Sequence, residues 1–462
     1  MNAIRKFYSG VKLGDTGAVF KISKDNLMAF VEGVDSDNIL EVNTLLPSLI
    51  KEAGLCYGIL NPPESQENIL VIAKGQEPIP GIDGRIEIVA KSYLEHKKAG
   101  LLDNPKNLNA IKNVSKGEII AKRIHPTPGT SGKDVFGNEI EPKHGEWVPF
   151  RPGEFVEIIN SDTMAAAASG ALVVENDGTI SVAREWTIKG DVDFSTGHVE
   201  FYGQKLVITG SVLGGFTVET MKDLYIGCHI EDEAIVLAGG NIFVKGIIRS
   251  QNTMVKAGGR LECGAIEYSR VFVGKDLVVK DYILNGGCQV HGSVLVTQGK
   301  GLVAGGRVLA GGSMNLKTAG TCANVPTYLS AGRDPLLEIH HNALIREQEK
   351  LSGKLQKVKE GLIKIKKLQT SGKPCDAGLE AIKQKLQAAA LDISNQMNSN
   401  KEKIRKIEKD FGLMEKATVS ISDLVYPNVK IKICDASLTL KHKAKNIMFF
   451  FKDGEIGAKT LS

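Results

Sequence analysis

The sequence contains no apolar run long enough to span a bilayer. Its longest mostly apolar stretch, Met164 to Val174, is too short and contains Ser169 and Gly170. The first twenty residues mix charges and glycines with short apolar runs, so they lack the apolar segment of a secretion signal. We therefore expect no membrane span, no targeting segment and a cytoplasmic location.

Paired cysteines are also missing. The seven cysteines stand at positions 56, 228, 263, 288, 322, 375 and 434, and no two of them form a CxxC motif. An odd number at irregular spacing argues against a disulfide framework or a zinc site and favours reduced thiols. Cys263 and Cys288 fall on apolar positions of the repeat described next, so we expect them in the core as small hydrophobic residues. We expect no metal and no cofactor.

Basic charge is scarce outside one segment. The chain carries 58 Lys+Arg and 53 Asp+Glu, a net charge of +5. Residues 333–416 hold 18 basic and 12 acidic residues, which leaves 40 basic and 41 acidic residues elsewhere. The positive balance therefore belongs to this segment and not to the fold as a whole.

A nine-residue unit recurs from about residue 200 to 320. In each unit, apolar residues stand two and four positions to either side of a central residue, and such alternation indicates strands with one buried face. The centres are Lys222, Gly240, Gly259, Lys275, Gly292 and Gly306. They lie 14 to 19 residues apart, which is too short for a strand, a crossover helix and a second strand.

A chain that coils and stacks on itself fits this spacing, with glycines at the corners. The repeat therefore predicts a parallel β-solenoid of six or seven coils. The hexapeptide spacing typical of left-handed solenoids is absent, which favours the right-handed form. Four residues are predicted to face inward: Val244, Leu261, Val279 and Val296. The open ends of such a stack need caps, because unpaired strands invite end-to-end association.

After Pro335 the apolar period changes to seven, which predicts a coiled coil. The first arm carries Leu337, Leu344, Leu351, Val358 and Ile365, with Leu355 and Leu362 beside them. A breaker from Thr370 to Gly378 precedes a second arm with Leu379, Leu386, Ile393, Ile407 and Met414, accompanied by Met397, Ile404 and Phe411. Gln348 and Asn400 interrupt the seam. From Thr418 the strand alternation returns, so the final segment should rejoin the solenoid and cover one end.

Together these patterns predict a mainly β protein. We expect a right-handed parallel β-solenoid with an N-terminal α/β domain, a β-rich linking domain and an inserted antiparallel coiled-coil hairpin. The expected segments are 1–90 (small α/β domain), 91–185 (β-rich domain), 186–332 (solenoid), 333–417 (hairpin) and 418–462 (return to the solenoid and end cap).

Several motifs resemble those of the flagellar assembly protein A family, also known as the DUF342 family. They are Gly117–Ala121, His125–Gly137, Gly190–Phe194 with Gly197, Gln298–Gly306 and Val425–Asn428. The resemblance follows their order over nearly the whole chain. At Asn428 the family pattern has glycine, and asparagine also tolerates a left-handed backbone. The resemblance implies a role in flagellar assembly or motility and supplies no mechanism.

Candidate catalytic groups lack a complete motif. Asp191 and Asp193 are a candidate Ca²⁺ site or acid/base pair, but we favour a turn with solvated carboxylates. His125 is a candidate base, and without a nucleophile motif nearby we interpret it as a loop residue. His340 and His341 lack ligand-type partners at helical spacing, so a metal site there is not expected.

Two further candidates concern anion binding. Gly299-Lys300-Gly301 does not match a P-loop, and solenoid corners explain its glycines better. Lysines and arginines of the hairpin are candidates for nucleic-acid binding: Lys364, Lys366 and Lys367 in the first arm, and Lys401, Lys403, Arg405 and Lys406 in the second. Interleaved acidic residues and the scarcity of aromatic residues favour a solvated coiled-coil surface that docks a partner.

Three hypotheses remain. The leading one is a non-enzymatic scaffold that binds protein partners in flagellar assembly or motility, and a homo-oligomer through the hairpin or a solenoid end is possible under it. The second is an enzyme that acts on polysaccharide in a solenoid groove. The third is nucleic-acid binding through the basic hairpin, which the interleaved acidic residues disfavour.

Overall fold

The computed structural model describes residues 2–66, 69–90, 111–370 and 377–461. The chain forms two compact units, one of residues 1–90, 118–165 and 175–180 and one of residues 91–117, 166–174 and 181–462. Residues 118–165 thus fold with residues 1–90, across the boundary expected at residue 90.

The first unit contains a five-stranded antiparallel sheet in the order β1-β2-β3-β5-β4. Helix α2 begins at Ile39, directly after its N-cap residue Asn38. The rings of Phe7 and Phe20 meet edge to face at 5.7 Å in its core. The elements of this sheet and its helices are α1 (Asn2–Ser9), β1 (Val11–Lys12), β2 (Val19–Ile22), β3 (Met28–Glu32), α2 (Ile39–Ala53), β4 (Ile59–Gln66) and β5 (Ile69–Lys74).

The rest of this unit is β-rich, and its backbone segments pack unusually close together. It comprises β6 (Arg85–Ile88), β8 (Ile119–Ile124), β9 (Gly132–Lys133), β10 (Glu139–Ile140), β11 (Val156–Asn160) and β12 (Thr163–Ala166). Backbones approach so closely here that a Cβ at Gly81 would lie 2.0 Å from the carbonyl oxygen of Thr127. A Cβ at Gly132 would lie 2.3 Å from that of Gln76. Contact between backbones therefore explains Gly132 in the 125–137 motif and also Gly129, where a Cβ would lie 2.6 Å from the carbonyl oxygen of Ile79, whereas Gly137 has a φ of +83°.

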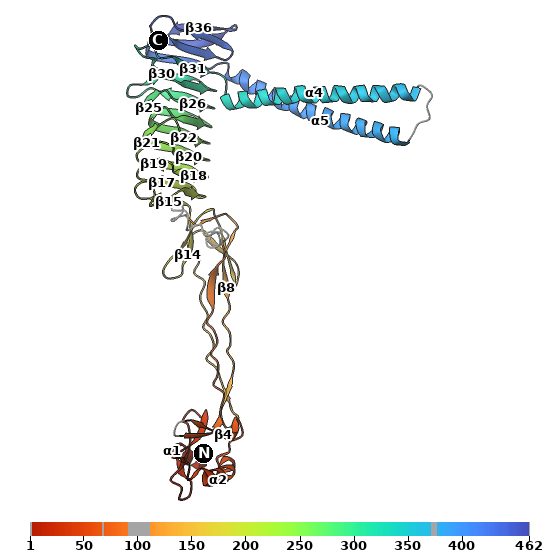
Figure 1. Ribbon diagram of the computed structural model, residues 1–462. Helices are drawn as coiled ribbons and strands as arrows, with labels where there is room; N and C mark the ends of the chain where they lie inside the picture. Colours follow the sequence, from red (N-terminus) through yellow and green to blue (C-terminus); the bar gives the residue numbers. More distant parts are fainter. Residues whose placement is uncertain (1, 67–68, 91–110, 371–376, 462) are drawn as a thin grey trace. The chain divides into compact units, whose positions relative to one another are not determined.

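The second unit is dominated by a parallel β-solenoid, drawn in Figure 1 as a stack of strands from β15 towards β31. One side is a twelve-stranded sheet that begins with β15 (Glu185–Ile188), β17 (Lys205–Ile208), β19 (Asp223–Ile226), β21 (Ile242–Arg249), β23 (Leu261–Glu267) and β25 (Leu277–Leu284) and continues with β27 (Val294–Val296), β28 (Leu302–Ala304) and β30 (Met314–Ala319). The other is a ten-stranded sheet that begins with β16 (Val199–Phe201), β18 (Thr217–Thr220), β20 (Ile235–Ala238), β22 (Met254–Ala257), β24 (Arg270–Val273), β26 (Gly287–Val290), β29 (Arg307–Ala310) and β31 (Thr327–Ala331). The predicted solenoid is confirmed; its handedness stays a prediction.

Each coil has three straight segments. The long strands β21, β23 and β25 contain a register shift, and in the next coil the two halves are the separate strands β27 and β28. In the earlier coils, the second half of the long strand is represented by single parallel bridges. These bridges run through Val192, Val212, Ile230 and Ile248. Residues 185–330 make eight turns, one for each strand of the ten-stranded sheet from β16 to β31, so the expectation of six or seven was too low.

The predicted inward residues are buried. Val244, Leu261, Val279 and Val296 are at most 4% exposed, and Cys263 and Cys288 are fully buried beside them. The unit assigned to Gly306 was wrong. Gly306 lies between β28 and β29, whereas the other centres precede a strand of the twelve-stranded sheet, and Gly312 is the residue that stacks on Gly292. The longer corner between β27 and β28 breaks the spacing and shifts the pattern.

Polar side chains link successive coils at the corners. The backbone N–H of Asn241 donates to Asp223 Oδ1 at 2.7 Å, and that of Arg260 donates to Asn241 Oδ1 at 2.9 Å. Further along, Ser293 N–H donates to Asp276 Oδ1 at 2.7 Å. These side chains satisfy backbone donors where the chain turns, so the coils remain in register.

Both ends of the solenoid are covered. After the inserted helices, β32 (Thr418–Val425) and β33 (Val429–Ile433) add one more parallel coil, and β34 (Ala436–Thr439), β35 (Ala444–Lys452) and β36 (Glu455–Thr460) then pair antiparallel. At the other end, Asn113 of β7 (Asn113–Val114) bonds the backbone of β16 through Glu200 O at 2.8 Å. Strand β7 belongs to a three-stranded sheet with β13 (Gly170–Val174) and β14 (Ile180–Ala183).

Helices α4 (Pro335–Thr370) and α5 (Ala377–Met414) form the predicted hairpin between β31 and β32, and Figure 1 shows them side by side. The seam residues Leu344, Leu351, Ile365 and Ile407 are buried. The predicted breaker lies largely in 371–376, outside the described residues. A Cβ at Gly332 would lie 3.2 Å from the carbonyl oxygen of Met414, so the two ends of the hairpin are adjacent, as expected.

Candidate interaction surfaces

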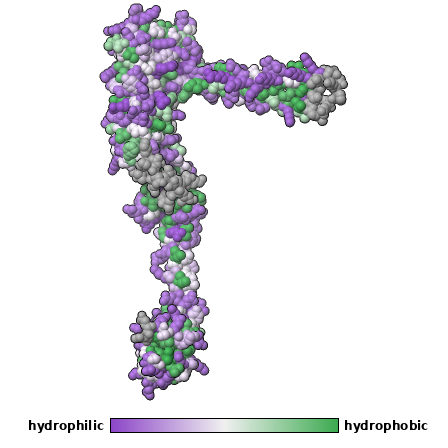
Figure 2. Space-filling model, in the orientation of Figure 1, coloured by the Kyte–Doolittle hydropathy of each residue, from purple (hydrophilic) through white to green (hydrophobic). Residues whose placement is uncertain are grey.

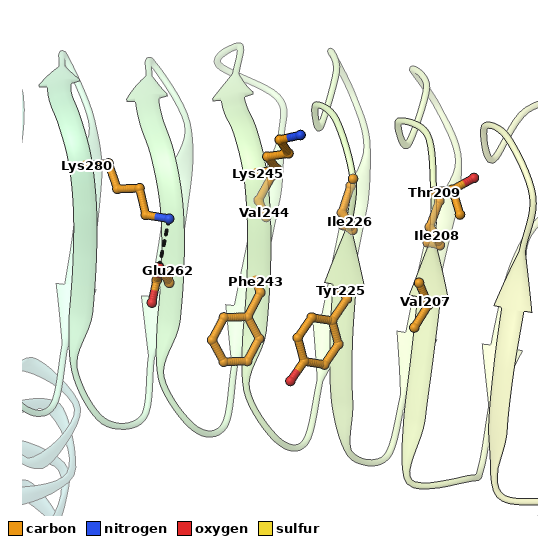
Figure 3. Close-up of a pocket in the computed structure, with 11 residues that line it drawn as sticks. Val207, Ile208, Thr209, Tyr225, Ile226, Phe243, Val244, Lys245, Glu262 and Lys280 are labelled. Carbon is orange, nitrogen blue, oxygen red and sulfur yellow. Dashed lines mark ion pairs between the residues drawn. The ribbon is translucent and has the colours of Figure 1, made fainter. Parts of the chain in front are cut away.

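A groove of about 430 Å³ runs along the outer face of the twelve-stranded sheet. Figure 3 shows its side chains on neighbouring strands of the stack. One wall is an outward-facing column of residues in direct register, Val207, Tyr225, Phe243 and Glu262. Gly227 lacks a side chain beside this wall, and the chain at Ile208, Ile226 and Val244 forms the floor.

Two aromatic rings dominate the wall. Tyr225 and Phe243 stack with centroids 4.7 Å apart and planes only 13° from parallel. The ammonium group of Lys205 lies 5.3 Å from the Tyr225 centroid. Strands β17 and β21 flank β19 on opposite sides, so Lys205 and Phe243 cover the two faces of the tyrosine ring. The ring edges therefore remain for a ligand in the groove.

The groove lining carries more positive than negative charge. Lys280 pairs with Glu262 at 3.0 Å, and Arg260 outside the lining also reaches Glu262 at 3.3 Å. Lys245 is exposed and has no ion-pair partner within the part of the chain that the structure describes. The lining residues thus carry two ammonium groups and one carboxylate, and the free positive charge is that of Lys245.

No pattern in the sequence indicated this groove. Its aromatic and basic residues occupy the outward positions of the repeat, which have no periodic signal of their own. Only the stacking of coils brings Tyr225 and Phe243, 18 residues apart, into contact. A search for aromatic residues at the coil spacing would have found the pair.

The two candidate carboxylates serve different turns. Asp191 Oδ1 accepts a hydrogen bond from the Ser211 N–H at 2.6 Å, as a corner link between coils. Asp193 Oδ1 accepts from the Ser195 hydroxyl at 2.6 Å and from its N–H at 2.8 Å. These bonds from Ser195 lower the pKa of Asp193. Each carboxylate therefore has a structural partner of its own, which favours the turn interpretation.

His125 lies directly after β8 with a carboxylate partner. Its Nε2 is 2.8 Å from Asp162 Oδ1, and its ring lies 4.9 Å from that of the exposed Trp147. Hydrogen bonds from Ser161, and then from His125, lower the pKa of Asp162. This is a surface pair beside an aromatic ring.

The histidines at the base of the hairpin differ from each other. His340 is exposed, whereas His341 lies against Phe411 with ring centroids 5.6 Å apart and approaches Glu408 at 3.7 Å. Among the described residues, no group of three or more His, Cys, Asp and Glu side chains is arranged to hold a metal ion.

Lys300 lies at the longer corner between β27 and β28. Gly299 and Gly301 both have positive φ, +46° and +57°, and the Lys300 N–H donates to Asp281 Oδ1 at 2.8 Å. The ammonium group of Lys300 lies 4.9 Å from the Tyr282 ring. The glycines thus serve the backbone of a corner, as the sequence interpretation favoured. At the corner near Asn324, Asn428 has a φ of +68°, which explains why asparagine replaces glycine there.

The positive charge of the hairpin is concentrated far from its base. Residues 354–392 contain nine lysines and four acidic residues, an excess of five out of the six found for residues 333–416. Apolar side chains are also exposed here, with Ile363 at 54% and Leu391 at 66%. On the face that Figure 2 shows, the hairpin is mainly hydrophilic with interrupted apolar patches. Within the helices that the structure describes, none is long and apolar enough to cross a membrane.

Two side-chain contacts fasten the base of the hairpin to the solenoid. Asp334 is 1% exposed, contacts His291 through its carboxylate, and accepts the Leu336 N–H at the start of α4 at 3.0 Å. Arg333 donates to Asp435 at 2.6 Å. The hydrogen bond from Arg333 lowers the pKa of Asp435.

The class of protein is therefore defined by a capped parallel β-solenoid with an inserted helical hairpin. Residues 184–456 match the β-solenoid domain of Flagellar Assembly Protein A, and residues 18–177 match its N-terminal region. The chain therefore belongs to the Flagellar Assembly Protein A family. Neither a curated protein nor a solved structure matches it.

Proposed function

We propose that this protein is a non-enzymatic cytoplasmic scaffold in flagellar assembly or motility, and that the helical hairpin holds a protein partner. Membership of the family supports the process. Free thiols at all six described cysteines support a reducing compartment. The segments 1–90, 91–185, 186–332, 333–417 and 418–462 are proposed as its functional divisions.

The observation that carries the proposal is the independence of the hairpin from the stack. Strand β32 pairs with β30 in parallel register, and β33 pairs with β31, as if the helices between them were absent. The hairpin thus adds 36 and 38 residues of helix that the solenoid does not use. Its excess of lysine and its exposed apolar side chains favour a protein with an acidic surface.

The test replaces residues 335–414 by a short Gly/Ser linker. Because the ends of the hairpin are adjacent, the linker closes a small gap at little cost in loop entropy. We expect the β-type circular dichroism to persist, the helical signal to fall, and cells that carry this variant at normal protein level to lose motility. Normal swimming would move the partner site to the N-terminal unit; loss of the soluble fold would make the hairpin structural.

The enzyme hypothesis is tested in the same cells. Asp191→Ala, Asp193→Ala and His125→Ala each remove a group whose bonds are structural, so we expect motility to persist wherever the variant stays folded. Loss of motility in one stably folded variant would favour an enzyme instead. For the nucleic-acid hypothesis, salt-sensitive binding of duplex DNA that disappears with the hairpin would be the favourable result.

A further inference from the structure

We infer that the groove along Val207, Tyr225 and Phe243 is a second binding site, and that it takes a peptide segment with an apolar side chain next to an acidic one. The site is independent of the hairpin. The inference rests on the proposed scaffold function in one respect, which is that the ligand is a protein.

The apolar part of the ligand follows from the lining. The wall is formed by Val207 and two aromatic rings. All three side chains face outward and are half-buried, so part of their apolar surface is in contact with water. A ligand that covered them would remove apolar surface from water, which is the usual source of affinity in such grooves. The apolar part of the groove crosses three successive strands, β17, β19 and β21, or roughly 10 Å at the spacing of strands in a sheet. That length accommodates a few residues of an extended peptide.

The acidic part follows from the edges of the rings and from Lys245. Aromatic rings are electropositive at their edges, and the edges of Tyr225 and Phe243 are what the groove presents. The ammonium group of Lys245 stands on the opposite side of the floor and lacks an ion-pair partner among the described residues. A carboxylate in the groove would meet both. Glu262 does not compete, because Lys280 and Arg260 already hold it.

The same geometry disfavours a sugar. Carbohydrate ligands lie flat on aromatic faces, and both faces of Tyr225 are covered, one by Lys205 and the other by Phe243. No outward carboxylate is free beside the rings in the described structure, since Glu262 is paired. For a sugar, the groove therefore offers neither an uncovered face of Tyr225 nor an unpaired carboxylate in the described structure.

Isothermal titration and ligand-observed NMR on the full chain test the site with three probes. They are N-acetyl-Glu-Phe-Glu-amide, the matched N-acetyl-Lys-Phe-Lys-amide and cellopentaose. We expect millimolar or tighter binding of the acidic peptide only. Phe243→Ala should abolish it, and Lys245→Glu should weaken it by about tenfold through charge reversal. Lys256→Glu, an exposed lysine of β22 on the other sheet, should leave it unchanged.

The outcomes are distinct. Absence of acidic-peptide binding, equal binding of both peptides, or binding that survives Phe243→Ala in a folded variant overturns the inference. Binding of cellopentaose alone would assign the groove to carbohydrate. Because Phe243 is half-buried, Phe243→Leu provides a milder variant, and a melting curve shows whether either variant is folded. The hairpin-deleted chain should still bind the acidic peptide, so failure here and failure of the hairpin proposal can be told apart.

Discussion

The backbone N–H of Thr418 donates a hydrogen bond to Ser313 Oγ at 3.0 Å, across 105 residues of sequence. Ser313 itself donates its N–H to Ser293 Oγ at 3.2 Å, one coil earlier. The corner links of the solenoid therefore continue through the point at which the hairpin is inserted. This contact fixes the register in which the chain returns to the stack.

Ser313→Ala should lower the free energy of unfolding by about 1 kcal/mol, because the Thr418 N–H loses its acceptor in a partly buried place. Chemical denaturation followed by circular dichroism measures the change. Ser437→Ala, at an exposed position of β34, is the matched control and should have no effect. Equal stability of the two variants would show that the corner link does not hold the returning strand.

Leu261→Asp should unfold the solenoid cooperatively. Leu261 is fully buried, and no cation lies within the apolar interior to pair with a carboxylate there, so the cost should reach about 4 kcal/mol or more. Lys256→Asp, at an exposed position of the preceding strand β22, serves as the control and should melt like the wild type. A wild-type melting curve for Leu261→Asp would contradict the assigned inward register.

Much of the solenoid could be predicted because its core positions repeat. Val244 and Leu261 follow a pattern that burial imposes on every coil. The nine-residue unit around Gly306 was assigned wrongly because the corner at Lys300 is longer than the others. Equal spacing therefore no longer identified equivalent positions in successive coils. The close backbone contacts of the first unit could not be predicted for another reason. They join backbone to backbone, so the only trace that they leave in the sequence is glycine. The groove could not be predicted because outward residues such as Tyr225 follow no periodic pattern in the sequence.

The buried cysteines should resist alkylation in the native protein. Desolvation raises the pKa of Cys288 to about 12 and that of Cys263 still further, so few thiolates form at either position. Mass spectrometry after iodoacetamide treatment should find Cys56, Cys228 and Cys322 modified and Cys263 and Cys288 unmodified. In denaturant, all seven cysteines should react. Rapid native labelling of Cys263 would show that the coil around it opens readily.

The seam of the hairpin contains two polar residues whose cost should be measurable. Asn400 is only 6% exposed, and neither its Nδ2 nor the Oε1 of Gln348 has a hydrogen-bond partner among the described residues. An unpaired buried polar group in a coiled coil is destabilising, and such residues are retained where they fix the register of the helices. Asn400→Leu should therefore slow hydrogen exchange in α4 and α5, with a gain of about 1 kcal/mol.

The matched control for this change is Asn398→Leu, two residues away on the exposed side of α5, which should leave exchange nearly unchanged. If Asn400 also fixes the pairing of the two arms, Asn400→Leu should broaden the assembly states seen by light scattering, because an all-apolar seam discriminates poorly between α4 and a helix of another molecule. Faster exchange in Asn400→Leu would show that the amide has a partner in solution. Slower exchange with an unchanged monomer mass would show that the polar seam costs stability without setting the register.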